Sequence, residues 1–207
     1  MRVTLSAASD AALVMHNERL ADPLDTITRA IGAVSKKRGK TITDHEEISR
    51  LEFFGGLYTT KPIEFENGDV QVPEDAEPAI PAWNLLRCLQ DGAKRNKRGL
   101  DVLRGVHPLE EFAQLDYEGP RDPQTMWKSQ EFVLRKTVGV QRARTTRTRP
   151  LFDGWTLRLP IEVDPEVFDL DSLTKAWDDA GKYAGLGEMR PVYGRFAAQV
   201  FAAEVKS

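Results

Sequence analysis

The sequence has very little cysteine and no long apolar run, and both absences limit what the chain can be. Its 207 residues include one cysteine, so a secreted scaffold built on internal disulfides is excluded. No stretch approaches the roughly 20 consecutive apolar residues that a membrane-spanning helix needs. The N-terminus also lacks the apolar core of a signal peptide. We therefore expect a cytoplasmic protein that makes no membrane contact.

Familiar catalytic motifs are also missing. The three histidines lie far apart in the sequence and form no metal-ligand pair, and there is no GxSxG or Walker A sequence. The thiol of Cys88 lies in a helical apolar pattern with no histidine nearby, which favours a buried, inert side chain. These absences predict a protein that is not an enzyme and that holds no cofactor and no metal. An enzyme site assembled from dispersed acids is an alternative, with Asp22, Asp44 and Glu46 as candidates.

The composition is that of a folded globular protein, with 41% hydrophobic and 29% charged residues. We expect one domain over residues 1–207, with insertions at about 40–80 and 105–130. Strict alternation from Trp155 to Val163 predicts a half-buried strand, and the run from Phe132 to Val140 is the longest other strand candidate. The Asn67-Gly68 pair predicts a tight hairpin turn. Asp169 is placed to cap the helix that follows it.

The order of the predicted elements favours an α+β fold. A strand at the N-terminus is followed by helices, two strands, a helix and a last strand that begins near Arg195. With the extra helices and the hairpin taken as insertions, this is the β-α-β-β-α-β order of a ferredoxin-like (RRM-like) antiparallel sheet. Such a sheet has helices on one face and leaves the other face free.

Charge is distributed unevenly, although the net charge is only −3. One basic cluster, at the expected end of a helix, contains Lys94, Arg95, Lys97 and Arg98. A second contains Arg135, Lys136, Arg142, Arg144, Arg147 and Arg149, and its part over about 141–150 reads as a basic arm. No acidic residue lies between Arg135 and Arg149, and threonines alternate with the later arginines. Guanidinium groups and hydroxyls suit contacts with phosphate.

Each cluster also has a structural interpretation. Positive charge at a helix C-terminus is stabilised by the helix dipole, so Lys94 to Arg98 can simply finish a helix, with Gly99 as its cap. The arm can be a solvated hairpin paired with acidic segments, or a protein–protein interface. A basic face and an acidic face on one chain would also suit head-to-tail self-association.

The run from Ala180 to Phe196 contains Gly185, Gly187 and Gly194 together with Arg190 and Arg195. It resembles the glycine-rich loop of the RAMP superfamily, the RNA-binding proteins of CRISPR effector complexes, and especially their backbone subunits. The resemblance implies that the loop joins the last helix of a ferredoxin-like domain to its last strand. It implies that the three glycines let the backbone approach a phosphate, and that Arg190 and Arg195 contact it. Phe196 stands where the family's pattern has a further glycine. A helix cap followed by a turn is the structural alternative for Gly185 to Gly187.

The chain as a whole is also similar to small proteins encoded by tailed bacteriophages of actinobacteria, which would place it in the host cytoplasm. These observations together predict a non-catalytic protein that grips single-stranded RNA or DNA by its backbone and self-associates head to tail. The alternative is a phage structural or assembly protein that self-associates through its charged faces.

Overall fold

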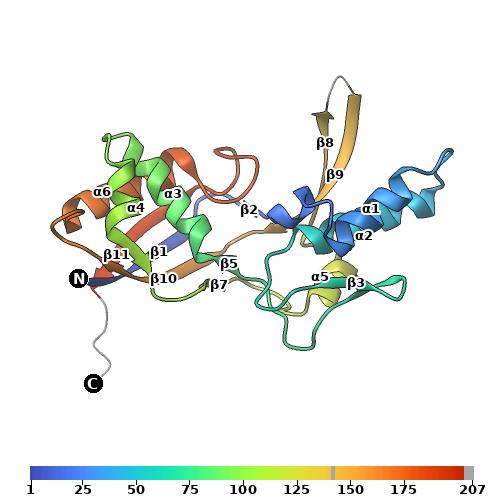
Figure 1. Cartoon of the computed structure of the whole chain (residues 1–207), viewed down its shortest axis with the longest axis horizontal. Helices are drawn as coiled ribbons and strands as arrows, with labels where there is room; N and C mark the ends of the chain where they lie inside the picture. The colour runs from blue at the N-terminus through green and yellow to red at the C-terminus, as the bar shows by residue number, and fades with distance from the viewer. Residues whose placement is uncertain (141–142, 203–207) are drawn as a thin grey trace. The chain divides into compact units, whose positions relative to one another are not determined.

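A computed structural model describes residues 1–140 and 143–202 of the chain (Figure 1). The chain divides into two compact units. Unit 1 contains Met1–Val14, Ala79–Glu118 and Phe152–Ser207, and unit 2 contains Met15–Pro78 and Gly119–Leu151. Unit 2 is therefore formed by two segments that interrupt unit 1. These segments include the predicted insertions at about 40–80 and 105–130 only in part.

Unit 1 contains an antiparallel sheet whose strands come from widely separated parts of the sequence (Figure 1). Its strands are β1 (Arg2–Ser9), β5 (Ile80–Pro81), β6 (Val106–Pro108), β7 (Phe112–Asp116), β10 (Thr156–Val163) and β11 (Phe196–Ala202). They are ordered β11-β1-β10-β7-β5, and β6 also pairs with β10. The described pairs are antiparallel. The chain is thus mixed α+β, as the sequence predicted.

Alternation along the central strands gives this sheet one buried face. In β10, Leu157, Leu159 and Ile161 are fully buried, while the residues between them are exposed or half-buried. The register of β1 places Leu5 opposite Leu159 and Ala7 opposite Leu157, and both partners are buried as well. The predicted alternation from Trp155 to Val163 is confirmed.

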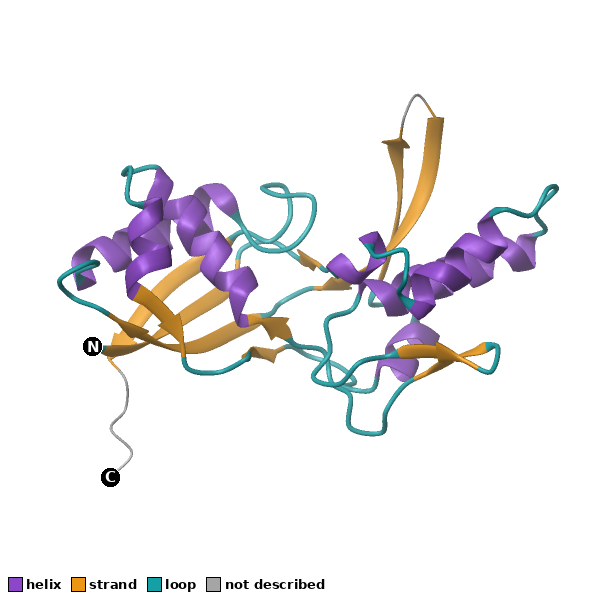
Figure 2. Ribbon diagram, viewed as in Figure 1, coloured by secondary structure: helices purple, strands orange, loops and turns teal. Residues whose placement is uncertain are grey.

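The helices of unit 1 lie along one side of this sheet (Figure 2). They are α3 (Ala82–Lys94), α4 (Gly99–Gly105), α6 (Leu170–Asp179) and the short η2 (Ala180–Ala184). The Asp169 side chain accepts a hydrogen bond from the Ser172 N–H, so the predicted cap of α6 is confirmed. The fully buried Trp177 ties α6 to the sheet, because its indole N–H donates to the Ser6 carbonyl at 2.8 Å and its ring lies 4.7 Å from that of Phe196.

Unit 2 combines helices with two hairpins. Its helices are η1 (Glu18–Ala21), α1 (Thr26–Ser35), α2 (Ile42–Gly56) and α5 (Pro123–Ser129). Its strands are β3 (Glu64–Glu66), β4 (Asp69–Gln71), β8 (Val133–Val140) and β9 (Ala143–Phe152). The short strand β2 (Leu13–Val14) ends the first segment of unit 1. The predicted hairpin turn is confirmed, since Asn67 and Gly68 join β3 to β4 with φ of 53° and 82°.

The long strand predicted from Phe132 to Val140 forms β8 but does not take the place in the sheet that the ferredoxin-like order implied. It does not enter the sheet of unit 1 but pairs with β9 as a hairpin, from Val133 opposite Pro150 to Val140 opposite Ala143. On the side of β10 away from β1, the neighbouring strand is instead β7, which lies in the stretch 105–130 that was predicted as an insertion. The alternation Phe112-Ala113-Gln114-Leu115-Asp116 was the available signal, with Ala113 and Leu115 buried.

Within the described residues, no helix combines the length and the apolar character that crossing a membrane requires.

Two helix glycines, one in each unit, test how tightly their helices are packed. A Cβ atom on Gly92 in α3 would lie 2.2 Å from the Ala176 carbonyl oxygen, whereas one on Gly32 in α1 would meet nothing within 4 Å. We expect Gly92→Ala to lower the free energy of unfolding by about 1–3 kcal/mol through overpacking. Gly32→Ala should raise it by about 0.5–1 kcal/mol, because alanine favours helix. Denaturant titrations followed by circular dichroism measure both changes, and equal effects of the two substitutions would contradict the close crossing.

Candidate nucleic-acid interface

The hairpin of β8 and β9 carries a long run of positive charge that no acidic residue interrupts. No carboxylate lies between Glu131 and Asp153, and this stretch holds all six cations of the second predicted cluster. Figure 1 shows the two strands side by side. Lys136 lies directly opposite Arg147, and Arg135 lies opposite Thr148. Because side chains alternate along a strand, Lys136 and Arg147 project from one face and Arg135 from the other.

A buried carboxylate from α2 holds the base of this hairpin. The Glu52 side chain is only 4% exposed and accepts a hydrogen bond from Arg147 at 2.5 Å. It also accepts the Thr148 backbone N–H at 2.8 Å. Like charges directly opposite each other on paired strands destabilise a sheet. Glu52 therefore offsets the repulsion between Lys136 and Arg147 at the point where the hairpin meets the helix.

The remaining cations of the hairpin differ in their surroundings. Arg135 is exposed, donates to Ser49 Oγ at 3.1 Å and to Gln130 Oε1 at 2.8 Å, and lies 5.6 Å from the Trp127 ring centroid. Lys136 is also exposed. Arg149 is buried and donates to the Thr148 carbonyl at 3.0 Å, so its guanidinium is part of the core of unit 2. Arg142 lies outside the described residues, and of Arg144 only the backbone, opposite Gly139, is described.

The cluster at the end of α3 lies in unit 1. Lys94 donates to Asp91 at 2.7 Å, and the Arg95 guanidinium lies 3.8 Å from the centroid of the Tyr183 ring. Lys97 is exposed and has a positive φ of 62°. The predicted cap Gly99 does not end the helix region but begins α4, because the turn between the helices is made by residues 95–98.

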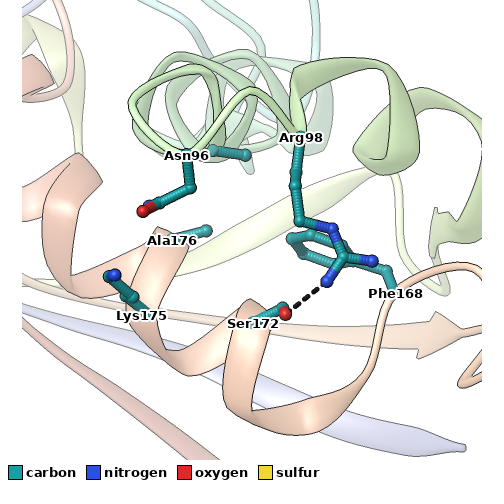
Figure 3. A pocket seen from close by; sticks show the side chains of 7 residues that line it. Asn96, Arg98, Phe168, Ser172, Lys175 and Ala176 are labelled. Carbon is teal, nitrogen blue, oxygen red and sulfur yellow. Dashed lines mark hydrogen bonds between the residues drawn. The ribbon is translucent and has the colours of Figure 1, made fainter.

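Arg98 is held by contacts with residues of α4 and α6, and Figure 3 shows its hydrogen bond with Ser172 of α6. It lines a small cavity of about 150 Å³, where its guanidinium hydrogen-bonds Ser172 and lies 4.9 Å from the Phe168 ring centroid. It also pairs with Asp101 at 2.8 Å and with Asp169 at 2.9 Å. Hydrogen bonds from Ser172 and Arg98 hold the pKa of Asp169 well below its usual range. Arg98 therefore joins two helices and has its donors engaged.

The glycine loop after η2 adopts the conformation that glycine favours. Gly185, Gly187 and Gly194 have φ of 75°, 74° and 72°. A Cβ atom on Gly194 would lie 1.8 Å from the Leu186 carbonyl oxygen, and one on Gly187 would lie 2.2 Å from the Val14 carbonyl oxygen. The close approach that these glycines allow is therefore an approach to other parts of unit 1.

The N–H groups of the loop are used within unit 1. Gly185 donates to Ala180, Leu186 to Gly194, Glu188 to Val14 and Gly194 to Ala12, each at 2.8 Å. In this conformation the loop therefore presents side chains, and not these N–H groups, to a ligand. The exposed Arg190 donates to the Gly185 carbonyl at 3.3 Å, and the side chain of Arg195 is exposed on the approach to β11.

The structure brings some of the predicted residues together and separates others. Arg95 and Arg190 come from different predicted clusters and line one pocket with Asp91 and Asp179. Sequence reasoning missed Asp91, Asp179 and Glu52. Glu52 carried a signal, because it is an acid inside the apolar run from Leu51 to Phe54, where an unpaired charge would be costly.

Comparison with models of known protein families and with curated proteins finds no match to this chain. In the described part, residues 1–140 and 143–202, no three histidine, cysteine or acidic side chains gather as ligands of a metal ion.

The anchoring role of Glu52 can be tested against a second glutamate on α2. We expect Glu52→Gln to lower the free energy of unfolding by roughly 1–3 kcal/mol, since it leaves Arg147 and the Thr148 N–H without their charged acceptor. Glu47→Gln weakens only a half-buried pair with Arg50, which also pairs with Asp69, and should cost less than about 1 kcal/mol. Chemical denaturation measures both changes. If the two substitutions cost the same, Glu52 does not anchor the hairpin.

Cys88 offers a probe of the glycine loop. Its thiol donates to the Gly185 carbonyl at 3.2 Å, and burial raises its pKa to about 12. We expect a thiol-reactive dye at neutral pH to label the native protein far more slowly than the unfolded protein, because the thiol is shielded and its reactive thiolate form is scarce. Gly194→Ala should raise the labelling rate by displacing the loop. Rapid labelling of the native wild-type protein would contradict this packing.

Proposed function

We propose that the protein is a non-catalytic nucleic-acid-binding protein that grips single-stranded RNA or DNA by its sugar–phosphate backbone. The observation that carries the proposal is the hairpin of β8 and β9, which is free of carboxylates and is held at its base by one buried glutamate. Arginine and lysine side chains bind phosphates with little regard to base sequence, so we expect affinity without strong sequence preference.

The surroundings of the cations indicate which of them act in binding. Arg147 and Arg149 are engaged with Glu52 and with the interior of unit 2, and we assign them to holding the hairpin. Arg135 and Lys136 are exposed on β8, and we assign them, with Arg142 and Arg144, to contacts with phosphate. The exposed threonines Thr137 and Thr146 lie opposite each other between these groups and supply neutral donors.

We also propose that unit 1 is a ferredoxin-like domain related to the RAMP superfamily. Support comes from the strand order β11-β1-β10-β7, since numbering these four strands along the chain gives the order 4-1-3-2 with helices after the first and third strands. Further support comes from the glycine loop, which lies between the last helix and the last strand of unit 1. Because the N–H groups of Gly185 and Gly194 are already engaged within unit 1, we assign binding at this site to the side chains of Arg190 and Arg195.

Fluorescence anisotropy with labelled single-stranded RNA and DNA at several salt concentrations tests the proposal. We expect log K to fall linearly with log salt concentration, with a slope that flattens by about 0.7 for each phosphate-binding cation that is removed. Arg142→Ala with Arg144→Ala should therefore flatten the slope by about 1.4. Arg149→Ala should act mainly on stability, because this side chain is buried.

A matched control removes two exposed cations elsewhere in unit 2. Lys36→Ala with Arg38→Ala changes the net charge equally but lies outside the hairpin. Equal flattening by both double variants would show that net charge alone governs binding and would contradict the assignment to the hairpin. Absence of binding to either nucleic acid at low salt would overturn the proposal. Salt-sensitive self-association that requires the same arginines would then identify the hairpin as an assembly surface.

A further inference from the structure

A second pocket of unit 1 lies where the end of α3, η2 and the glycine loop meet. Its volume is about 400 Å³. The charged and aromatic residues that line it are Asp91, Arg95, Asp179, Tyr183 and Arg190. The basic end of α3 and the glycine loop are almost 100 residues apart in sequence, yet each contributes an arginine to this pocket.

The two carboxylates of the pocket make their shortest contacts with groups other than its arginines. Asp91 accepts a hydrogen bond from Lys94 Nζ at 2.7 Å, and Asp179 accepts one from Asn96 Nδ2 at 3.0 Å. The Arg95 Nε atom is 3.9 Å from Asp179 Oδ1. Arg190 Nη1 is 3.7 Å from Asp91 Oδ2. Both distances are too long for hydrogen bonds, so each arginine is attracted to a carboxylate without being bound by it.

The local charge balance is positive. Arg87 also faces Asp91, with its Nε atom 3.8 Å from Oδ1. The pocket and its rim thus hold Arg87, Lys94, Arg95 and Arg190 around Asp91 and Asp179. This leaves an excess of two positive charges. A phosphate monoester carries close to two negative charges at neutral pH, because its second pKa is about 6, whereas a phosphodiester carries one.

Both arginines are already positioned before any ligand arrives. The Arg95 guanidinium lies on the Tyr183 ring at 3.8 Å, which restricts its rotation and adds a cation–π attraction. Arg190 donates to the carbonyl of Gly185, whose own N–H is donated to Ala180. A guanidinium carries five N–H donors, more than these contacts use. Side chains that are held in place lose less entropy when a ligand binds.

We propose that this pocket binds the dianion of a phosphate monoester, with Arg95 and Arg190 as its two guanidinium donors. Two sources supply this chemistry, namely the phosphorylated end of a nucleic-acid strand and a free mononucleotide. Binding of a phosphorylated strand end rests on the proposed function, whereas binding of a free mononucleotide does not. In either case the pocket distinguishes a terminal phosphate from the phosphodiesters within a strand.

The experiment compares strands of one sequence that carry a 5′-phosphate, a 3′-phosphate or only hydroxyl ends, using anisotropy with an internal label. We expect one phosphorylated strand to bind roughly tenfold more tightly than the hydroxyl strand, because two charge-assisted hydrogen-bonding arginines reach its phosphate. Arg95→Gln should abolish this difference and leave the binding of the hydroxyl strand unchanged. Arg190→Ala should also abolish it, and should in addition weaken the binding of all three strands, because Arg190 is one of the side chains assigned to strand binding. Calorimetry with adenosine monophosphate, and with adenosine as the control, tests the free nucleotide.

The outcomes separate this proposal from the proposed function. Equal binding of all three strands, with no binding of adenosine monophosphate, overturns the pocket assignment and leaves binding through the hairpin intact. Binding of adenosine monophosphate that disappears in Arg190→Ala, with no binding of any strand, supports the pocket and overturns the proposed function. Arg104→Ala is the matched control, since Arg104 is an exposed cation of α4 that does not line the pocket. Disappearance of the phosphate preference in that variant would also overturn the assignment.

Discussion

The close crossing of α3 and α6 is the constraint on which the arrangement of unit 1 depends. At Gly92 the two helices approach so closely that a single added carbon would lie within 2.2 Å of the α6 backbone. The ends of both helices therefore converge, and Arg95, three residues after Gly92, comes within reach of Asp179 and Tyr183. A larger residue at this position would separate the helices and with them the groups that line the pocket. The close packing of α3 on α6 and the position of Arg95 in the pocket thus both depend on the small size of Gly92.

Elements whose signals are local were predictable from the sequence. The alternation in β10, the cap at Asp169 and the turn at Asn67-Gly68 are each determined by residues within a few positions of one another. The partner of a strand is not determined in this way. The run from Phe132 to Val140 has the composition of a sheet strand, but its pairing depends on β9, whose own sequence is so basic that it was interpreted as an arm. Hairpin pairing lets such a strand form, because the backbone hydrogen bonds do not depend on the side chains.

The sequence predicted which basic residues form the candidate site, but not which of them are engaged within the protein and which face a ligand. In sequence, Arg98 and Arg95 are equivalent members of one cluster, yet Arg98 is bound by Asp101, Asp169 and Ser172 while Arg95 faces a pocket. Asp101 is close to Arg98 in sequence, but Asp169 and Asp179 are more than 70 residues from the arginines they face, and only the fold brings them near. The same holds for Arg147, whose partner Glu52 is 95 residues away. A basic cluster in a sequence therefore overstates the number of cations that are available to a ligand.

The two basic sites differ in how their positive charge is tolerated, and this difference bears on what each can bind. At the hairpin a single buried carboxylate anchors Arg147, and the exposed cations follow along extended strands, which suits an extended polyanion. At the pocket two carboxylates stand within 4 Å of the arginines without hydrogen-bonding them, which concentrates the excess charge in one place. Because Coulomb attraction falls with distance and is screened over about 8–10 Å in physiological salt, a concentrated charge favours a compact dianion over dispersed single charges. In the proposed assignment, the hairpin therefore contacts the length of a strand and the pocket takes a terminal phosphate.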